Sequence, residues 1–310
     1  MSDSKLTVTI AGITGRFARL LVKYLLKKPN IHINGTTRDT SKAPASLSNN
    51  SRITLFQATT EDTEGLRKAL KGANVAVYCA LGWHDVMLDG QKKFIDAAIA
   101  EGVPRYVAGD WTSDFRKLKV GDHEGKDDMK HIAAYLDERQ DKIKAIHVLN
   151  GGFMETVFSP FLGFVDTEKD EFYIREGGNI KSAMTTYGDA AAVTAEVIAD
   201  RNASGYIEVA GSLLSAVEIA KIYGQVYGVE PKLVDRGSFA EAKEQLAQLK
   251  KDQPNPYAWM GLNYQIIVWN GQNELDNADN ARFSNIKFTT IQDYFQRVKK
   301  EKLATEMGEL

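Results

Sequence analysis

The chain opens on a β-branched run that is followed at once by a glycine turn. Leu6–Ile10 suits a strand, Gly12 and Gly15 follow, and an apolar helical pattern starts at Arg16. Gly12 allows a tight turn, Gly15 lets a phosphate approach the backbone, and Ala18 lets the helix pack closely on the strand. The free N–H groups at the start of such a helix favour phosphate. The pattern predicts a dinucleotide-binding turn made of Gly12, Thr14, Gly15, Arg16 and Phe17.

The first half of the chain alternates strand-like and helix-like segments. The predicted strands are Leu6–Ile10, Ile31–Thr37, Ile53–Gln57, Val75–Ala80, Tyr106–Gly109 and Ala145–Leu149, and the predicted helices are Arg16–Lys28, Thr63–Lys71, Leu88–Glu101 and Asp127–Arg139. This alternation is typical of an α/β fold of the Rossmann type, a doubly wound parallel sheet covered by helices on both faces. Ligands bind beyond the carboxyl ends of such strands, so we expect functional residues directly after them.

After Leu149 the alternation stops, and the pattern predicts a smaller C-terminal α+β substrate lobe. The expected elements are strands at Glu171–Arg175 and Tyr206–Ala210, a helix capped by Asp189, a helix from the Ser215–Glu218 capping box to Gly228, a helix at Phe239–Lys251, and a largely helical stretch from Tyr257 to Leu303. We expect residues 1–155 to form the dinucleotide-binding domain, with 186–212 returning to it. Residues 156–185 and 213–310 would form the smaller lobe.

Composition excludes several classes of function. A net charge of −2 over 310 residues argues against nucleic acid or an anionic membrane as the main partner. A single cysteine excludes an intramolecular disulfide and suits a reducing compartment. No apolar run is long enough to span a membrane, and the first residues lack a signal-peptide pattern, so we expect a cytoplasmic protein. His123 and His131 lack partners at ligand spacing, which predicts no metal site.

The residues after the second strand indicate which nucleotide is bound. An NAD-binding unit carries an acid at this strand tip for the ribose 2′-OH, whereas here the tip carries Arg38, followed by Lys42. A guanidinium suits a 2′-phosphate, so NADP(H) is favoured. Asp39 keeps NAD(H) open as an alternative, and Lys42 is equally interpretable as an exposed loop lysine.

Five segments, two of them discussed above, match the sequence pattern of a known protein family: Gly12–Gly15, Thr37–Lys42, Gln91–Val107, Gly151–Glu155 and Thr186–Asp189. On these segments the chain, to about Gly228, resembles the NmrA-like, isoflavone-reductase-like group of atypical short-chain dehydrogenases. The resemblance implies a Rossmann domain with a small substrate lobe and NADPH as cofactor. It is compatible with a reductase of secondary metabolism, with a regulator that binds the dinucleotide without turnover, and with a non-redox catalyst.

The catalytic residues depart from what the resemblance implies. The string from Tyr24 to Lys28 matches the Tyr-x-x-x-Lys pair of the larger superfamily but lies on the first helix, far from the strand ends. The isoflavone-reductase group uses a lysine on the helix after the fifth strand, a register that falls here on Met129. Lys130 is one residue away and Lys126 about one turn earlier, so both are candidate proton donors. Alternatively, both lysines are solvated.

The loop after the fourth predicted strand supplies further candidates. Ala80 and Gly82 would lie against the cofactor, and Trp83 would overhang the pocket. His84 could donate a proton near neutral pH, or be an ordinary surface histidine.

The loops after the fifth and sixth strands also carry candidates. Trp111 would form a pocket wall, and Thr112 or Ser113 would orient the substrate. Gly152 and Phe153 would contact the cofactor. Met154 would contact the substrate, although core packing is favoured for a methionine here.

These observations predict an NADPH-dependent reductase of a small hydrophobic carbonyl, enone or imine. The aromatic residues in Phe158–Phe164 and Tyr257–Trp259 suit an apolar, possibly aromatic substrate, but equally suit lobe packing or a dimer surface. A non-catalytic NADP(H)-binding regulator and an isomerase or cyclase remain alternatives, and the protein could be a monomer or a homodimer.

Overall fold

A seven-stranded parallel sheet forms the centre of the larger lobe. The computed structural model describes residues 4–275, 279–303 and 305. The sheet order is β11-β6-β5-β4-β1-β2-β3. The strands are β1 (Leu6–Ala11), β2 (Ile31–Thr37), β3 (Ile53–Gln57), β4 (Val75–Tyr78), β5 (Arg105–Val107), β6 (Lys144–Leu149) and β11 (Gly205–Glu208), and all pairings between them are parallel. The order in which strands are added reverses at β1, because β2 and β3 lie on one side of it and β4, β5 and β6 on the other. A ligand site is expected at such a point.

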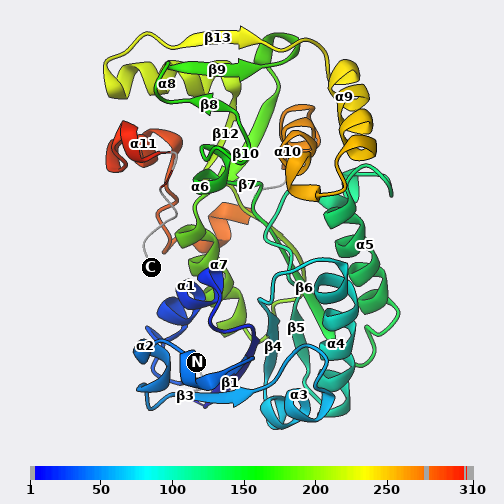
Figure 1. Ribbon diagram of the computed structural model, residues 1–310. Helices are drawn as coiled ribbons and strands as arrows, with labels where there is room; N and C mark the ends of the chain where they lie inside the picture. Colours follow the sequence, from blue (N-terminus) through cyan, green and yellow to red (C-terminus); the bar gives the residue numbers. More distant parts are fainter. Residues whose placement is uncertain (1–3, 276–278, 304, 306–310) are drawn as a thin grey trace.

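Helices cover both faces of this sheet (Figure 1). The helices are α1 (Arg16–Leu25), α2 (Ala45–Ser48), α3 (Thr63–Leu70), α4 (Gln91–Ala100), α5 (Glu124–Asp137) and α7 (Tyr187–Ala199). One buried apolar cluster joins the sheet to α1 and α7, and a second joins it to α3, α4 and α5. The doubly wound Rossmann-type fold is therefore confirmed.

The packing of α1 and β4 explains why these segments adopt their structures. Leu20, Leu21 and Leu25 form a buried stripe on α1, and the four residues of β4 are all buried. A strand that is covered on both faces is apolar throughout rather than alternating. Each fully buried leucine contributes about 1.5–3 kcal/mol through the hydrophobic effect.

Element boundaries differ from the prediction where side chains take over backbone hydrogen bonds. The predicted strand Tyr106–Gly109 stops at Val107, because the Gly109 N–H donates to Oε1 of Gln91 at 2.9 Å. A π-helical turn at Asp85–Gly90 precedes α4, in place of the helix predicted from Leu88. Helix α5 begins at Glu124, one turn before the predicted start, and this places Lys126 in its first turn.

The predicted helix caps were partly wrong. Thr186, not Asp189, caps α7, because the Thr186 hydroxyl accepts from the Asp189 N–H at 3.1 Å. The Asp189 carboxylate instead accepts from the Thr289 N–H at 2.8 Å. The capping box of Ser215 and Glu218 is confirmed, and Gly228 ends that helix in the left-handed region at φ +68°.

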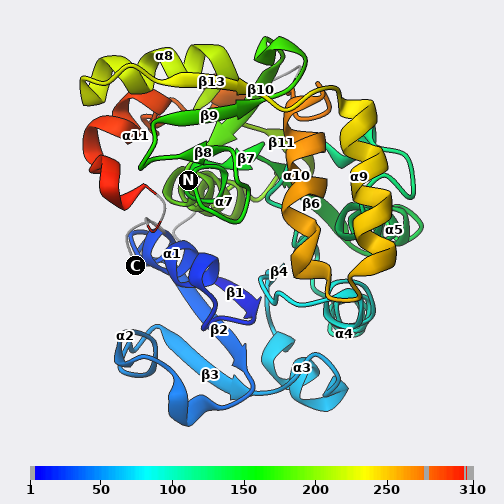
Figure 2. The ribbon, with the colours of Figure 1, turned by 45° about the horizontal axis from the view of Figure 1, so that its top comes forward.

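The smaller lobe lies beyond the carboxyl ends of the main strands (Figure 2). It contains one sheet of β12 (Ser212–Ser215), β10 (Lys181–Thr185) and β7 (Gly152–Phe153), and another of β13 (Lys232–Asp235), β9 (Glu171–Ile174) and β8 (Val165–Asp166). Its helices are α6 (Met154–Val157), α8 (Ala216–Tyr227), α9 (Phe239–Asp252), α10 (Met260–Trp269) and α11 (Ile291–Arg297). The predicted helical stretch from Tyr257 to Leu303 is therefore interrupted between α10 and α11, and residues 276–278 of it lie outside the described residues.

Aromatic packing holds this lobe together. Phe158 and Phe164 are each 1% exposed and belong to the lobe's apolar cluster, so they serve the core and not an open substrate pocket.

The packing of α7 and β11 with the main sheet bears on the division into lobes. We propose that residues 1–155 and 186–212 form the larger lobe, and that residues 156–185 and 213–310 form the smaller one. Within the described residues, no helix is both long and apolar enough to cross a membrane.

Candidate active site

The glycine turn lies at the carboxyl end of β1 and has no room for a side chain at Gly12. Gly12 has φ +72°, and a Cβ there would lie 2.8 Å from Cα of Ala80. The Gly15 N–H donates to the Gly12 carbonyl at 3.0 Å, and no side chain caps α1. The first N–H groups of α1, beginning at Arg16 and Phe17, thus face the turn without a side-chain acceptor. With the adjacent Thr14, this cradle fits a pyrophosphate.

Arg38 and its neighbours form the tip after β2. Arg38 is exposed and has no hydrogen bond or ion pair among the described residues. Asp39 accepts from the Ser41 N–H and hydroxyl at 3.0 and 2.6 Å, and these bonds hold the pKa of its carboxyl below the ordinary value. Asp39 also pairs with Lys42 at 3.3 Å. Both Asp39 and Lys42 are thus engaged locally, whereas Arg38 is available for a ligand.

The loop from Ala80 to His84 lies at the rim between the lobes. Trp83 is 44% exposed, and its ring meets that of Tyr257 in the smaller lobe edge-on at 5.4 Å. The Gly82 position is crowded by Val86, whose Cβ would be 2.7 Å from an added Cβ, which explains this glycine by local packing. His84 is largely exposed, and its Nδ1 lies 2.6 Å from Oδ1 of Asp128 on α5.

Trp111 turns its indole toward α1 and α7. Its indole N–H donates to the Thr194 hydroxyl on α7 at 2.9 Å, and its ring lies 4.2 Å from that of Phe17. Its φ of +39° is rare for a residue with a side chain and costs on the order of 1–3 kcal/mol. In this conformation the indole is partly buried beside Phe17, at the start of α1.

Lys126 lies at the centre of the candidate site. Although charged by type, it is only 3% exposed, and its Nζ donates to the Thr112 hydroxyl at 2.5 Å. The Tyr264 ring, from α10, lies 5.2 Å from the same Nζ. Burial lowers the pKa of Lys126 to about 8, and the charge of Asp110 partly opposes that shift. A lysine with this pKa is suited to proton transfer near neutral pH.

The other candidates on this side of the sheet do not join Lys126. Lys130 is half-buried on the same helix, with no hydrogen bond or ion pair among the described residues, and Met129 is buried. Ser113 is buried, but Thr112 supplies the hydroxyl that Lys126 contacts. The Tyr-x-x-x-Lys string from Tyr24 to Lys28 is not a catalytic pair, because Lys28 forms an ion pair with Glu196 on α7 at 2.8 Å.

The residues after β6 frame the opposite side of the glycine turn. Gly152 and Phe153 form β7, and the Phe153 ring stacks on Tyr187 at 4.0 Å and lies 6.1 Å from Phe17. Met154 is fully buried in the apolar cluster of the smaller lobe, which corrects its prediction as a substrate contact.

Several polar groups of this region were not predicted. His123 is 1% exposed, its ring meets Tyr264 at 4.4 Å, and neither ring nitrogen has a hydrogen-bond partner among the described residues. Burial lowers the pKa of His123 to about 3, so the ring is neutral. Glu155 is equally buried, and burial raises its pKa to about 7. No local motif marks His123, because the packing of α5 against α10 buries it. Glu155 ends the segment Gly151–Glu155, but only its burial beside the first turn of α7 shows that its pKa is raised.

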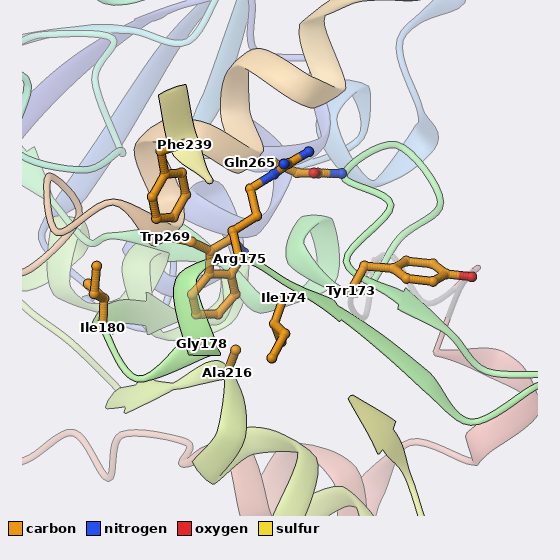
Figure 3. Close-up of a pocket in the computed structure, with 9 residues that line it drawn as sticks. All are labelled: Tyr173, Ile174, Arg175, Gly178, Ile180, Ala216, Phe239, Gln265 and Trp269. Atoms are coloured by element: carbon orange, nitrogen blue, oxygen red, sulfur yellow. The ribbon is translucent and has the colours of Figure 1, made fainter. Parts of the chain in front are cut away.

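A separate cavity in the smaller lobe is too small for a substrate (Figure 3). Its volume is about 20 Å³, enough for one water molecule. Nε of Arg175 and Nε1 of Trp269 are buried beside it without hydrogen-bond partners among the described residues. Across the same residues, no group of three or more His, Cys, Asp or Glu side chains has the arrangement of a metal site.

Comparison with known proteins shows that the chain is similar in sequence to a reductase and in shape to proteins solved with NADP+ or NADPH. It is 25% identical over 271 residues to an isoflavone reductase of Glycine max, covering 80% of this chain and 79% of that protein. It superposes on AtPrR2 with NADP+ and (+)pinoresinol with a TM-score of 0.80 at 16% identity, covering 94% and 98% of the two chains. It also superposes on the Escherichia coli quinone oxidoreductase QOR2 complexed with NADPH, with a TM-score of 0.74 at 23% identity, covering 93% and 98%.

Residues 4–295 match the sequence pattern of the NmrA-like family. This match spans nearly the whole chain, including both lobes and every residue of the candidate site. The protein belongs to the NmrA-like family.

Proposed function

We propose that this protein is an NADPH-dependent reductase of a small hydrophobic carbonyl, enone or imine. The observation that carries the proposal is the buried Lys126, with its lowered pKa, hydrogen-bonded to Thr112 beyond the carboxyl end of β5. The family membership and the NADP-dependent reductases among the relatives support the same class of reaction.

The chain offers a matched set of groups for NADPH. The turn from Gly12 to Phe17 would hold the pyrophosphate, and Arg38 would bind the 2′-phosphate. Lys42 could reach the same phosphate only by leaving Asp39. Gly152 and Phe153 would lie beside the nicotinamide. When bound, the nucleotide supplies a hydride.

Lys126 would then supply the proton. Its ammonium donates to the atom on which negative charge develops, and the Thr112 hydroxyl, which already accepts from Nζ, holds the amine in place. With a pKa of about 8, most of the amine is protonated at pH 7, yet the proton leaves more readily than from an ordinary lysine. The ring of Tyr264 provides apolar surface near this point, and Trp83 and Tyr257 pack together at the rim between the lobes.

The test is a reductase assay at 340 nm with NADPH or NADH and a panel of aromatic ketones, enones, imines and quinones. Lys126→Met should lower kcat by on the order of 10²–10⁴-fold while NADPH still binds. Lys130→Met is the matched control on the same helix and should stay active. A fully active Lys126→Met enzyme would overturn the assignment of the proton donor.

One observation favours a second function, that of a non-catalytic NADP(H)-binding regulator. The Lys126 amine is enclosed beneath Tyr264 in this structure, so this lysine does not present an open acid at the rim. Tight NADPH binding without turnover of any substrate class would support the regulator, or a non-redox isomerase or cyclase.

A further inference from the structure

A buried acid–histidine pair lies behind the Lys126 site. Oδ2 of Asp110 lies 2.7 Å from Nδ1 of His147, and the two side chains are 1% and 2% exposed. Asp110 belongs to the loop after β5, and His147 to β6. His147 is held in turn by stacking on Tyr206, with ring centres 4.5 Å apart. The pair is therefore rigid and contributed by two neighbouring strands of the sheet.

This pair has one unused acceptor, and Lys126 has unused donors. Oδ1 of Asp110 is buried without a hydrogen-bond partner among the described residues. Of the three protons of the Lys126 ammonium, one is donated to Thr112, only two residues after Asp110, and Sδ of Met129 at 3.9 Å is a weak acceptor. A buried carboxylate oxygen without a partner costs free energy unless a positive group or a water lies close.

Two other buried titratable groups near Lys126 carry no charge. His123, at the start of α5, is neutral because burial lowers its pKa to about 3. Tyr264, from α10, is neutral near pH 7, and burial raises its pKa further, to about 12. The charge of Asp110 opposes the fall in the pKa of Lys126 that burial causes.

We propose that Asp110 is a positioning residue for Lys126: its carboxylate, fixed by His147, is the buried counter-charge that keeps the Lys126 amine protonated and ready to donate. The proposal rests on the proposed function for its consequence in catalysis, but the electrostatic link itself does not. A neighbouring opposite charge favours the charged form of a buried amine, whereas desolvation alone favours the neutral form. The contact of 2.7 Å between Nδ1 of His147 and Oδ2 of Asp110 holds the carboxyl group in place.

The link can be measured without substrate or nucleotide. Full-length protein labelled with ¹³C at lysine Cε would be titrated by NMR, and the Lys126 signal would be assigned as the one lost in Lys126→Met. In Asp110→Asn we expect the midpoint of the Lys126 titration to fall by about 1–3 pH units. An unchanged midpoint would overturn the proposal.

Two further variants control for structural damage. Asp114→Asn removes another buried carboxylate of the same loop, one that is paired with Arg116 at 2.7 Å, and should leave the Lys126 midpoint unchanged. If Asp110→Asn does not fold, Asp110→Ser removes the same charge and leaves room for a water that can accept from His147. An equal shift in Asp114→Asn would mean that general loosening of the loop, not the Asp110 charge, sets the midpoint.

Kinetics separate this proposal from the proposed function. In an active enzyme, the alkaline limb of the pH profile of kcat should move to lower pH in Asp110→Asn by the same amount as the NMR midpoint. A shifted midpoint in a protein without reductase activity would contradict the proposed function and leave the Asp110–Lys126 link standing. An unmoved limb in an active Asp110→Asn enzyme would contradict the positioning role.

Discussion

The ammonium of Lys126 and the ring of Tyr264 lie 5.2 Å apart across the boundary between the two lobes. Lys126 belongs to α5 beside the main sheet, and Tyr264 to α10 of the smaller lobe. Two hydrogen bonds of Glu124 fasten the same junction, one from Lys250 of α9 at 2.5 Å and one from Asn263 of α10 at 3.0 Å. The smaller lobe therefore sets how dry the Lys126 site is.

Removing the Tyr264 ring should hydrate Lys126. In Tyr264→Ala, water reaches the amine, so we expect the pKa of Lys126 to rise from about 8 toward its ordinary value of 10.5. The measurement is the NMR titration of the Lys126 Cε signal. Tyr257→Ala, at the exposed rim of the same lobe, is the control and should leave the midpoint in place. A midpoint of about 8 in both variants would show that other groups keep the amine dry.

Arg38 should decide between the two nucleotides. In Arg38→Ala, NADPH loses a charge-assisted contact worth about 1.5–3 kcal/mol, or roughly 10–150-fold in Kd, while NADH loses little because it lacks the 2′-phosphate. Titration of both nucleotides by calorimetry measures this difference. Lys42→Ala, whose side chain is already paired with Asp39, should have the smaller effect. Equal losses for NADPH and NADH in Arg38→Ala would refute the assignment.

Gly12 should tolerate no side chain, for two separable reasons. In Gly12→Ala the new Cβ would lie 2.8 Å from Cα of Ala80, in addition to the strain of φ +72°. Gly72→Ala is a matched control, because φ is +75° there and nothing lies within 4 Å. We expect Gly72→Ala to cost about 1–2 kcal/mol of unfolding free energy, and Gly12→Ala to cost more and to abolish NADPH binding. Similar losses of stability, with nucleotide binding retained, would mean that the turn can shift away from Ala80.

Glu155 should make the protein less stable at higher pH. Its pKa of about 7 is above the ordinary 4.5, so between these values the unfolded chain ionises while the folded protein keeps the proton. Folding stability therefore falls as pH rises from about 4.5 to 7, and Glu155→Gln should remove up to about 3 kcal/mol of this loss. Urea unfolding at pH 5 and pH 8 measures it. Glu218→Gln is the control of opposite sign, because hydrogen bonds in its capping box hold the pKa of Glu218 below the ordinary value. A gain in Glu155→Gln that is the same at both pH values would contradict the ionisation argument.

Local signals predicted the parts of this protein that short segments specify. The strands Ile31–Thr37 and Ile53–Gln57 have the predicted bounds, and the glycine turn lies where the strand–glycine–helix order placed it. These features depend on β propensity, backbone freedom and helix periodicity, which neighbouring residues determine. The wrong cap at Asp189 arose because its side chain bonds to the distant backbone of Thr289.

By itself, the sequence determined the Rossmann-type sheet and the glycine turn after β1, and it places Arg38 rather than an acid directly after the second strand. Only the tertiary structure decided that Lys126, rather than Lys130, meets Thr112, and that Asp110, His123 and Tyr264 surround it. The physical reason is that burial and Coulomb interactions act through space. The pKa of Lys126 depends on groups from the β5 loop and from α10, which chain order does not bring together but packing of the two lobes does.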